Sequence, residues 1–255
     1  MGVQNTIFDI QARVGITKHL GGQDATDEII RLCEIENAKH ILDVGAGTGF
    51  TAVYIAKKYG IKVTGIDLSE KMVAAAQARA KREKVEELTD FRTADVQELP
   101  FDDSTFDAVI CESVLAFPAD KQKAVNQMAR VLKPGKFLGI NEGAWIKKDP
   151  PEDVIAWVAQ DLSHNARLLT HEEWTLLLVN AGLKELFTRP YKITMKQEAK
   201  RVISRYGLKE MIGAWGKSFS IFFRERQSRE ILKESIKMPK DALKYFGYGI
   251  YIGRK

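Results

Sequence analysis

A glycine turn and a distant acidic residue are the first features of the sequence that could bind a ligand. The run Gly45-Ala-Gly-Thr-Gly49 follows a short apolar segment, 40–44, and precedes a helical pattern. Glycines let backbone amides approach a ligand closely, and the N-terminus of the following helix favours a negative group. Asp67 stands at the end of the next apolar run, where its carboxylate could accept hydrogen bonds from two ribose hydroxyls. Taken alone, this pattern is also typical of a dinucleotide site.

Alternating strand-like and helix-like patterns position these residues. After the glycine turn, Ala52, Ile55, Ala56 and Tyr59 recur at helical spacing, and the pattern ends at Gly60. The expected strands are 40–44, 62–66, 90–93, 106–111, 136–140, 184–194 and 246–252. Strands that alternate with helices of this length predict right-handed crossovers and a mostly parallel sheet covered on both faces.

Glycines and prolines set the expected ends of several helices. A helix over 24–36 is expected, and a helix that ends at the pair Gly21 and Gly22 would explain that pair. The helix after the fourth strand is expected to close at Pro134 and Gly135. About fifty residues of helical pattern after 194 are expected to break at Gly207 and at Gly216.

Composition bounds the class of protein. The 255 residues, 45% hydrophobic and 29% charged, are typical of one globular domain with elaborations and exclude disorder. No run approaches the roughly 18 apolar residues of a membrane span, and residues 1–20 lack the layout of a signal peptide. Two cysteines, Cys33 and Cys111, are too few for a disulfide framework or a cysteine metal cluster. We therefore predict a cytoplasmic protein without stable membrane insertion.

Five motifs carry a family resemblance. They are Ile41-Leu-Asp-Val-Gly-Ala-Gly-Thr-Gly-Phe50, Val63-Thr-Gly-Ile-Asp67, Ala94-Asp-Val-Gln-Glu-Leu-Pro-Phe101, Phe106-Asp-Ala-Val-Ile-Cys-Glu112 and Arg130-Val-Leu-Lys-Pro-Gly135. In this order and spacing, over roughly 18–140, the sequence resembles class I S-adenosylmethionine-dependent methyltransferases. It most resembles the small-molecule branch related to ubiquinone and menaquinone biosynthesis. The resemblance makes a dehydrogenase an unfavoured alternative.

Together with the patterns, the resemblance implies an α/β fold. We expect a Rossmann-like, doubly wound, seven-stranded and mostly parallel sheet with an antiparallel last strand and a helical cap inserted before it. The whole chain, 1–255, is expected to form a single methyltransferase domain. Its expected parts are an N-terminal lid segment over 1–23, a cofactor-binding core over 24–141, further sheet and helices over 142–196, a cap over 197–245 and the last strand over 246–255.

The resemblance also implies a cofactor, S-adenosylmethionine, with S-adenosylhomocysteine as product. The residues implied to bind it are Asp43, Gly45, Ala46, Gly47, Thr48, Asp67, Leu68, Met72, Asp95, Val96, Cys111, Glu112 and Ser113. Asp43 and the glycine turn would hold the ammonium and carboxylate, Asp67 the ribose, and Asp95 the adenine amino group. Neutral and acidic groups suit a cofactor that carries a sulfonium but no phosphate. For Cys111, a buried apolar role is the favoured alternative.

The sequence singles out no catalytic base. Methyl transfer from a sulfonium is an in-line displacement that depends on positioning and on exclusion of water, so a base is needed only if the acceptor must lose a proton. His19, Glu112 and Glu142 are the candidates near the expected methyl end. No cluster of ligands at metal-binding spacing is evident, so no metal is predicted.

The charge balance separates the core from the cap. Residues 1–183 carry 21 Lys and Arg against 27 Asp and Glu, whereas residues 184–255 carry 18 against 7. The basic surplus could be a solvated helix face, an attraction for an acidic substrate, or a nucleic-acid surface. The lack of a basic and aromatic RNA motif argues against nucleic acid.

The cap is the expected place of substrate selection. Its aromatic residues could line an apolar pocket or pack the cap onto the sheet: Trp215, Phe219, Phe222, Phe223, Tyr245 and Tyr248. We therefore predict a methyltransferase for a small, partly apolar molecule, with the choice among O-, N- and C-methylation left open. The alternatives are an RNA or protein methyltransferase that uses the basic cap, and a non-catalytic cofactor-binding regulator. The oligomeric state is not predicted.

Overall fold

The structure is a computed structural model that describes residues 7–17, 19–162, 166–234, 239 and 241–255. Its strands are β1 (His40–Val44), β2 (Lys62–Asp67), β3 (Thr89–Thr93), β4 (Phe106–Glu112), β5 (Leu132–Trp145), β6 (Leu169–Thr170), β7 (Lys184–Lys192) and β8 (Phe246–Arg254). Within the described residues these strands form one sheet in the order β3-β2-β1-β4-β5-β8-β7, and β6 pairs with β5 beside this path.

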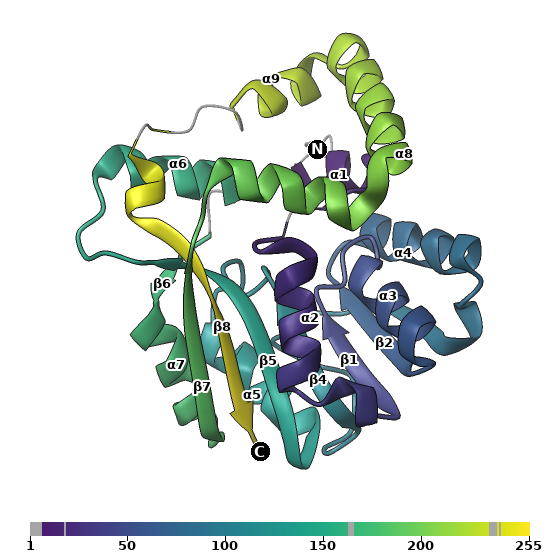
Figure 1. Cartoon of the computed structure of the whole chain (residues 1–255), viewed down its shortest axis with the longest axis vertical. Coiled ribbons are helices and arrows are strands. Elements are labelled where there is room, and N and C mark those ends of the chain that lie inside the picture. Colours follow the sequence, from purple (N-terminus) through teal and green to yellow (C-terminus); the bar gives the residue numbers. More distant parts are fainter. Residues whose placement is uncertain (1–6, 18, 163–165, 235–238, 240) are drawn as a thin grey trace.

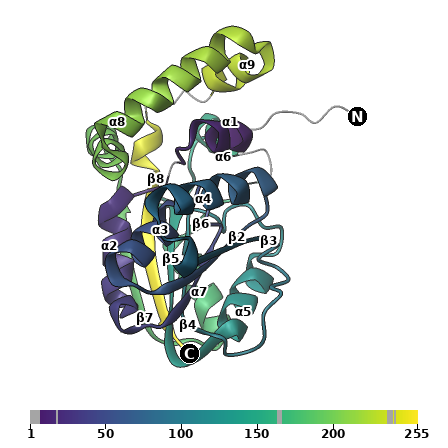
Figure 2. The same cartoon turned by 90° about the vertical axis from the view of Figure 1, so that its right-hand side faces the viewer.

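Helices cover both faces of the sheet (Figures 1 and 2). They are α1 (Ile7–Val14), α2 (Gly22–Leu32), α3 (Phe50–Tyr59), α4 (Glu70–Glu83), α5 (Lys121–Val131), α6 (Glu152–Leu162), α7 (His171–Asn180), α8 (Met195–Arg224) and α9 (Arg226–Glu234). Successive strand residues face opposite sides, so Ile41 packs in the apolar cluster of α2, α3 and α4, whereas Leu42 packs in that of α5 and α7. Short 3₁₀ turns lie at Ile35–Asn37, Glu86–Leu88 and Ala242–Lys244.

The register of the parallel strands brings three strand ends to one edge. Val44 of β1 pairs with Ile66 of β2 and with Cys111 of β4. The loops that follow these strands therefore meet at the same edge, and α1 and α8 lie beyond it (Figure 1). In open α/β sheets this edge is where ligands bind.

The predicted fold class is confirmed. β8 runs antiparallel to both of its neighbours, β5 and β7, and the cap helices α8 and α9 precede it in the chain. The two-residue strand β6 is the one addition to the predicted seven strands within the described residues.

The expected boundary between the fourth helix and the fifth strand is wrong. Helix α5 ends at Val131, and β5 begins at once and runs through Pro134 and Gly135. The pairing with β4 jumps from Phe106↔Leu132 to Ala108↔Phe137, so this Pro-Gly pair lies in a bulge of the strand. A bulge explains how a proline and a glycine with φ of 75° are accommodated inside a strand.

Two other glycine-based expectations also change. Gly21, with φ of 79°, is the residue before the first turn of α2, so the Gly21-Gly22 pair begins a helix instead of ending one. Gly207 breaks α8 as expected, with φ of 75° and ψ of 160°, but Gly216 lies inside the continuous second half of that helix.

No helix in the described part of the chain has both the length and the apolar character needed to span a membrane.

Candidate cofactor and acceptor site

A cavity of about 490 Å³ lies at the edge where β1, β2 and β4 end. Most of the residues implied to bind the cofactor line it: Asp43, Gly45, Ala46, Gly47, Asp67, Leu68, Met72, Asp95, Val96, Glu112 and Ser113. The register of the strands brings them together, although they come from four separate stretches of the chain.

Thr48 and Cys111 are not among the residues that line this cavity, and for Cys111 this agrees with the alternative of a buried apolar role. Thr48 is buried at the start of α3, and its backbone carbonyl accepts a hydrogen bond from Arg79 Nε over 3.0 Å. Cys111 packs in the core cluster of α5, on the face of β4 opposite to Ile110. Burial raises the pKa of the Cys111 thiol, so the residue is an inert apolar side chain.

The glycine turn packs closely against the loop after β4 and leads into the N-terminus of α3. Gly45 has φ of 70°, and a Cβ there would lie 2.1 Å from Val114 Cγ2. Gly49, with φ of 75°, precedes α3 without any side-chain cap. The Ala52 amide in the first turn of α3 donates to the Asp43 carboxyl instead, and the N-terminus of α3 favours a negative group at this end of the cavity.

Asp67 connects the end of β2 to the glycine turn. Its Oδ2 atom accepts a hydrogen bond from the Gly47 backbone amide over 2.9 Å, and Oδ1 accepts one from the Ser69 amide over 2.9 Å. Burial raises the pKa of Asp67, while these two hydrogen bonds act in the opposite direction. A carboxylate oxygen accepts more than one donor, so each oxygen can still take a ligand hydroxyl.

Asp43 has an unsatisfied oxygen. It is 3% exposed, and its Oδ2 atom has no hydrogen-bond partner among the described residues. Burial and the nearby Glu112 together raise the pKa of Asp43 to about 8, while Arg205 and a hydrogen bond from the Ala52 amide act in the opposite direction. A buried carboxyl oxygen without a partner beside a cavity suits a cationic ligand, such as the ammonium of the implied cofactor.

The opposite end of the cavity is suited to a flat, partly apolar ring. Leu68 is 73% exposed yet lines the cavity, and Met72 and Val96 contribute buried apolar surface. Asp95 also lines this end, with Oδ1 accepting the backbone amide of Gln97 over 2.8 Å. These contacts fit the adenine that the family resemblance implies for this part of the site.

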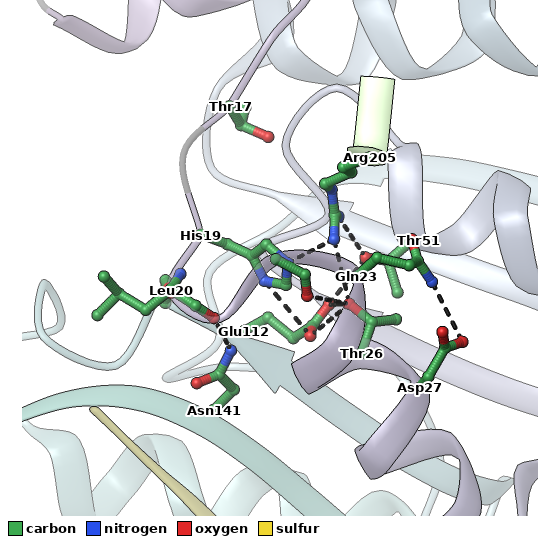
Figure 3. A network of polar contacts seen from close by, with 12 residues as sticks. Thr17, His19, Leu20, Gln23, Thr26, Asp27, Thr51, Glu112, Asn141 and Arg205 are labelled. Carbon is green, nitrogen blue, oxygen red and sulfur yellow. Dashed lines mark hydrogen bonds and ion pairs between the residues drawn. The ribbon is translucent and has the colours of Figure 1, made fainter. Parts of the chain in front are cut away.

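A polar network closes the cavity below the cap (Figure 3). The Glu112 carboxylate accepts hydrogen bonds from Thr51 Oγ1 over 2.8 Å and from Thr26 Oγ1 over 2.9 Å. His19 Nδ1 lies 3.4 Å from Glu112 Oε1, and His19 Nε2 contacts Nη1 of Arg205. Burial lowers the pKa of His19 to about 4, although Glu112 acts in the opposite direction, so the imidazole is neutral at pH 7.

Comparison with known proteins agrees with this geometry. A family model described as a methyltransferase domain matches residues 42–140. An uncharacterized protein of Haemophilus influenzae is 30% identical over 72% of this chain and 74% of its own length. The chain belongs to the S-adenosylmethionine-dependent methyltransferases.

Other relatives of this methyltransferase have named reactions. Norajmaline N-methyltransferase of Rauvolfia serpentina is 32% identical over 64% of this chain and 54% of its own length. The O-methyltransferase cnsE of Penicillium expansum is 33% identical over 66% of this chain and 60% of its own length. The chain thus spans less than two thirds of these two relatives.

The fold of the methyltransferase recurs in a solved structure with a different reaction. The crystal structure of the [4+2]-cyclase SpnF has a TM-score of 0.77 at 21% identity, and the match covers 98% of this chain and 93% of the other. This likeness concerns the fold alone, because one fold hosts different reactions.

Of the three candidate bases in the methyltransferase, His19 and Glu112 reach the cavity and Glu142 does not. Glu142 is buried, and its oxygens accept the backbone amides of Leu115 over 2.7 Å and Gly143 over 2.9 Å. Burial raises the pKa of Glu142 to about 7, and these hydrogen bonds act in the opposite direction. Glu142 therefore stabilises the loop after β4 from the protein interior. This loop includes Ser113, whose backbone is left-handed with φ of 59°.

The N-terminal residues of the methyltransferase reach the cavity as well. Phe8 and Gln11 of α1, together with Thr17, line it. Tyr206 of α8 holds Thr17 through a hydrogen bond from the Thr17 amide over 3.1 Å and one to its carbonyl over 3.0 Å. The predicted lid over 1–23 includes residues 1–6 and Lys18, which lie outside the described residues.

The sequence did not point to Thr26, Thr51 or Arg205. Thr51 follows the glycine turn and was within reach of a motif argument, since it lies in the first turn of α3. Arg205 lies in a basic helical stretch in which no local signal distinguishes it from its neighbours.

For the cap aromatics, pocket lining and packing onto the sheet were both left open, and the structure does not place them in the cavity lining. Trp215, Phe219 and Phe223 are more than 60% exposed, and none of the cap aromatics proposed for a pocket lines the cavity. Tyr248 instead stacks on Tyr191 with ring centroids 4.8 Å apart. The aromatic wall of the cavity is formed by Phe8 and Phe117, whose rings meet edge to face at 5.3 Å.

Proposed function

We propose that this methyltransferase transfers a methyl group from S-adenosylmethionine to an oxygen or nitrogen atom of a small, partly apolar molecule. One observation carries the proposal: a single cavity joins the glycine turn and Asp67 to the His19 and Glu112 pair under the cap. The names of relatives support small acceptors, since one acts on norajmaline and another on 27-O-demethylrifamycin SV.

The cofactor assignments in this proposal follow the chemistry of the donors. Asp67 would bind the ribose, Asp43 and Glu112 would face the ammonium and sulfonium, and Leu68 with Asp95 would border the adenine. The orphaned Oδ2 atom of Asp43 supports this orientation, because a cation there would satisfy it. When bound, the cofactor supplies an electrophilic methyl group on its sulfonium.

The chain itself would contribute position, exclusion of water and, for some acceptors, a proton acceptor. Phe8 and Phe117 provide an apolar wall for the acceptor. For an acceptor that must lose a proton, we assign that proton to Nε2 of the neutral His19 imidazole, which would exchange its contact with Arg205 for the acceptor. The Glu112 carboxylate, 3.4 Å from Nδ1, would stabilise the resulting imidazolium.

Two measurements test the function. Calorimetry should show S-adenosylhomocysteine binding to the full chain, and tritium from the S-adenosylmethionine methyl group should appear in phenolic or amine acceptors of natural-product type. Failure of S-adenosylhomocysteine to bind would contradict the cofactor assignment. Binding without transfer to any acceptor in an extensive panel would favour a non-catalytic cofactor-binding protein instead.

Three broader assignments belong to the same proposal. We place the lid in 1–23, the cofactor-binding core in 24–141, the continuation of the sheet in 142–196, the cap in 197–245 and the last strand in 246–255. The relationship to the ubiquinone and menaquinone branch stays a prediction. A cytoplasmic location is supported by two buried free cysteines, Cys33 and Cys111, which suit a reducing compartment.

A further inference from the structure

One basic side chain reaches the cavity from the cap. Among the described residues that line the cavity, Arg205 of α8 is the single lysine or arginine, whereas the acidic residues there are Asp43, Asp67, Asp95 and Glu112. Of the many lysines and arginines in the cap, Arg205 is therefore the one that reaches the cavity within the described residues.

Several elements hold Arg205 in place (Figure 3). Its Nη2 atom donates to Thr51 Oγ1 of α3 over 2.9 Å, and Nη1 donates to Thr26 Oγ1 of α2 over 3.1 Å. Its Cζ atom lies 4.3 Å from the ring centroid of Phe50. The Nε atom of Arg205 is buried and has no partner in the described part of the chain. The guanidinium is fixed in position while part of its donor capacity is unused.

Arg205 and Glu112 form a pair of opposite charges bridged by two hydroxyls. Thr51 and Thr26 each donate to Glu112 and each accept from Arg205. A positive and a negative group therefore stand side by side at one end of the cavity. The ligand group that matches such a pair is a zwitterion, with an ammonium facing the carboxylate and a carboxylate facing the guanidinium.

The order of the strands places this pair at the amino-acid end of the cofactor. With its ribose at Asp67 on β2, a bound cofactor would extend over β1 towards β4, because these strands are neighbours in the order β2-β1-β4. Glu112 ends β4, and Thr51 lies in the first turn of α3, whose N-terminus also favours an anion.

We propose that Arg205 binds the α-carboxylate in the methionine part of S-adenosylmethionine. This inference rests on the proposed function and adds that the cap, through one residue, recognises the cofactor as well as covering it. The alternative is that the guanidinium binds an anionic group of the methyl acceptor. An experiment can tell whether the anion comes from the cofactor or from the acceptor.

The test compares S-adenosylmethionine with its decarboxylated form, which keeps the adenosine, the sulfonium and the amine but lacks the carboxylate. Calorimetry on the full chain should give the wild type at least about tenfold tighter binding of S-adenosylmethionine. In Arg205→Met, the affinity for S-adenosylmethionine should fall to that for the decarboxylated form, which itself should change by less than about twofold. Arg205→Lys should retain part of the preference, because it keeps the charge.

Arg201→Met is the matched control. Arg201 lies one turn earlier on α8 and pairs with Asp24 and Glu198 outside the cavity lining, so its loss should leave the preference unchanged. An unchanged preference in a folded Arg205→Met or Arg205→Lys variant would overturn the inference and assign the guanidinium to the acceptor. Failure of S-adenosylmethionine to bind the wild type would instead contradict the proposed function itself.

Discussion

The backbone amide of Gly47 donates a hydrogen bond to the Oδ2 atom of Asp67 over 2.9 Å. The acidic residue at the end of β2 therefore holds the glycine turn that follows β1, in addition to facing the cavity. One carboxylate thus shapes the backbone of the turn and is available to ribose hydroxyls.

Asp67→Ala is expected to weaken S-adenosylhomocysteine binding by at least about tenfold, because it removes a charged acceptor of ribose hydroxyls and loosens the turn. Calorimetry measures the change. Asp90→Ala is the control, because Asp90 pairs with Arg92 on β3 and does not line the cavity. Equal binding by the wild type and the Asp67 variant would show that the ribose lies elsewhere.

Gly45→Ala should destabilise the fold more than Gly60→Ala. Both glycines have a left-handed backbone, with φ of 70° and 68°, so each alanine costs about 1–2 kcal/mol. A Cβ at Gly45 would also lie 2.1 Å from Val114 Cγ2, whereas nothing lies within 4 Å at Gly60. We expect about 1–3 kcal/mol of additional loss in the free energy of unfolding at Gly45.

Urea unfolding of both variants measures this difference. Adding Val114→Ala to Gly45→Ala should recover most of the excess, since it removes the clash but not the backbone strain. Equal losses at the two glycines would mean that Val114 moves aside easily, and that close packing does not explain the glycine.

Cofactor binding should release a proton from Asp43. In the free protein, burial raises the pKa of Asp43 from 3.8 to about 8, so the carboxyl is largely protonated at pH 7. A cation beside it favours the charged form, and the proton leaves. Calorimetry at pH 7 in buffers of different ionisation enthalpy should detect release of up to about one proton, and Asp43→Asn should abolish that release.

The same pKa determines the pH dependence of folding stability. The folded state holds this proton more tightly than the unfolded state, so its stabilising contribution is full below about pH 4 and is lost as pH rises through about 8. The free energy of unfolding of Asp43→Asn should lack this decline. Asp107→Asn should keep it, because Asp107 pairs with Lys133 outside the cavity.

His19→Gln should lower kcat by about 10²–10⁴-fold for an acceptor that must lose a proton. Its effect on the Kd of S-adenosylhomocysteine should be much smaller than its effect on kcat, because the imidazole is assigned to the acceptor and touches the cofactor site only through Arg205 and Glu112. His40→Gln is the control, since His40 bonds to Thr64 on the sheet and lies outside the cavity lining. A loss of cofactor affinity without a change in kcat would assign His19 to the cofactor.

The amino-acid sequence by itself determined the sheet and one half of the site. Strand-like runs that alternate with amphipathic helices define a parallel sheet because each pattern is local. The glycine turn and Asp67 were equally readable, because each stands at the end of a strand. Boundaries were less accurate where Pro134 and Gly135 form a bulge that only the pairing with β4 reveals.

The other half of the site was decided by the tertiary structure. Arg205 meets Thr51 and Thr26, which are 154 and 179 positions away in the chain, and no local spacing encodes such contacts. Packing also separated residues that are adjacent in the sequence: Glu112 reaches the cavity while Cys111 is buried in the core. The physical reason is that successive side chains of a strand point to opposite faces of the sheet. Whether a side chain reaches the cavity or the core depends on what packs against its face.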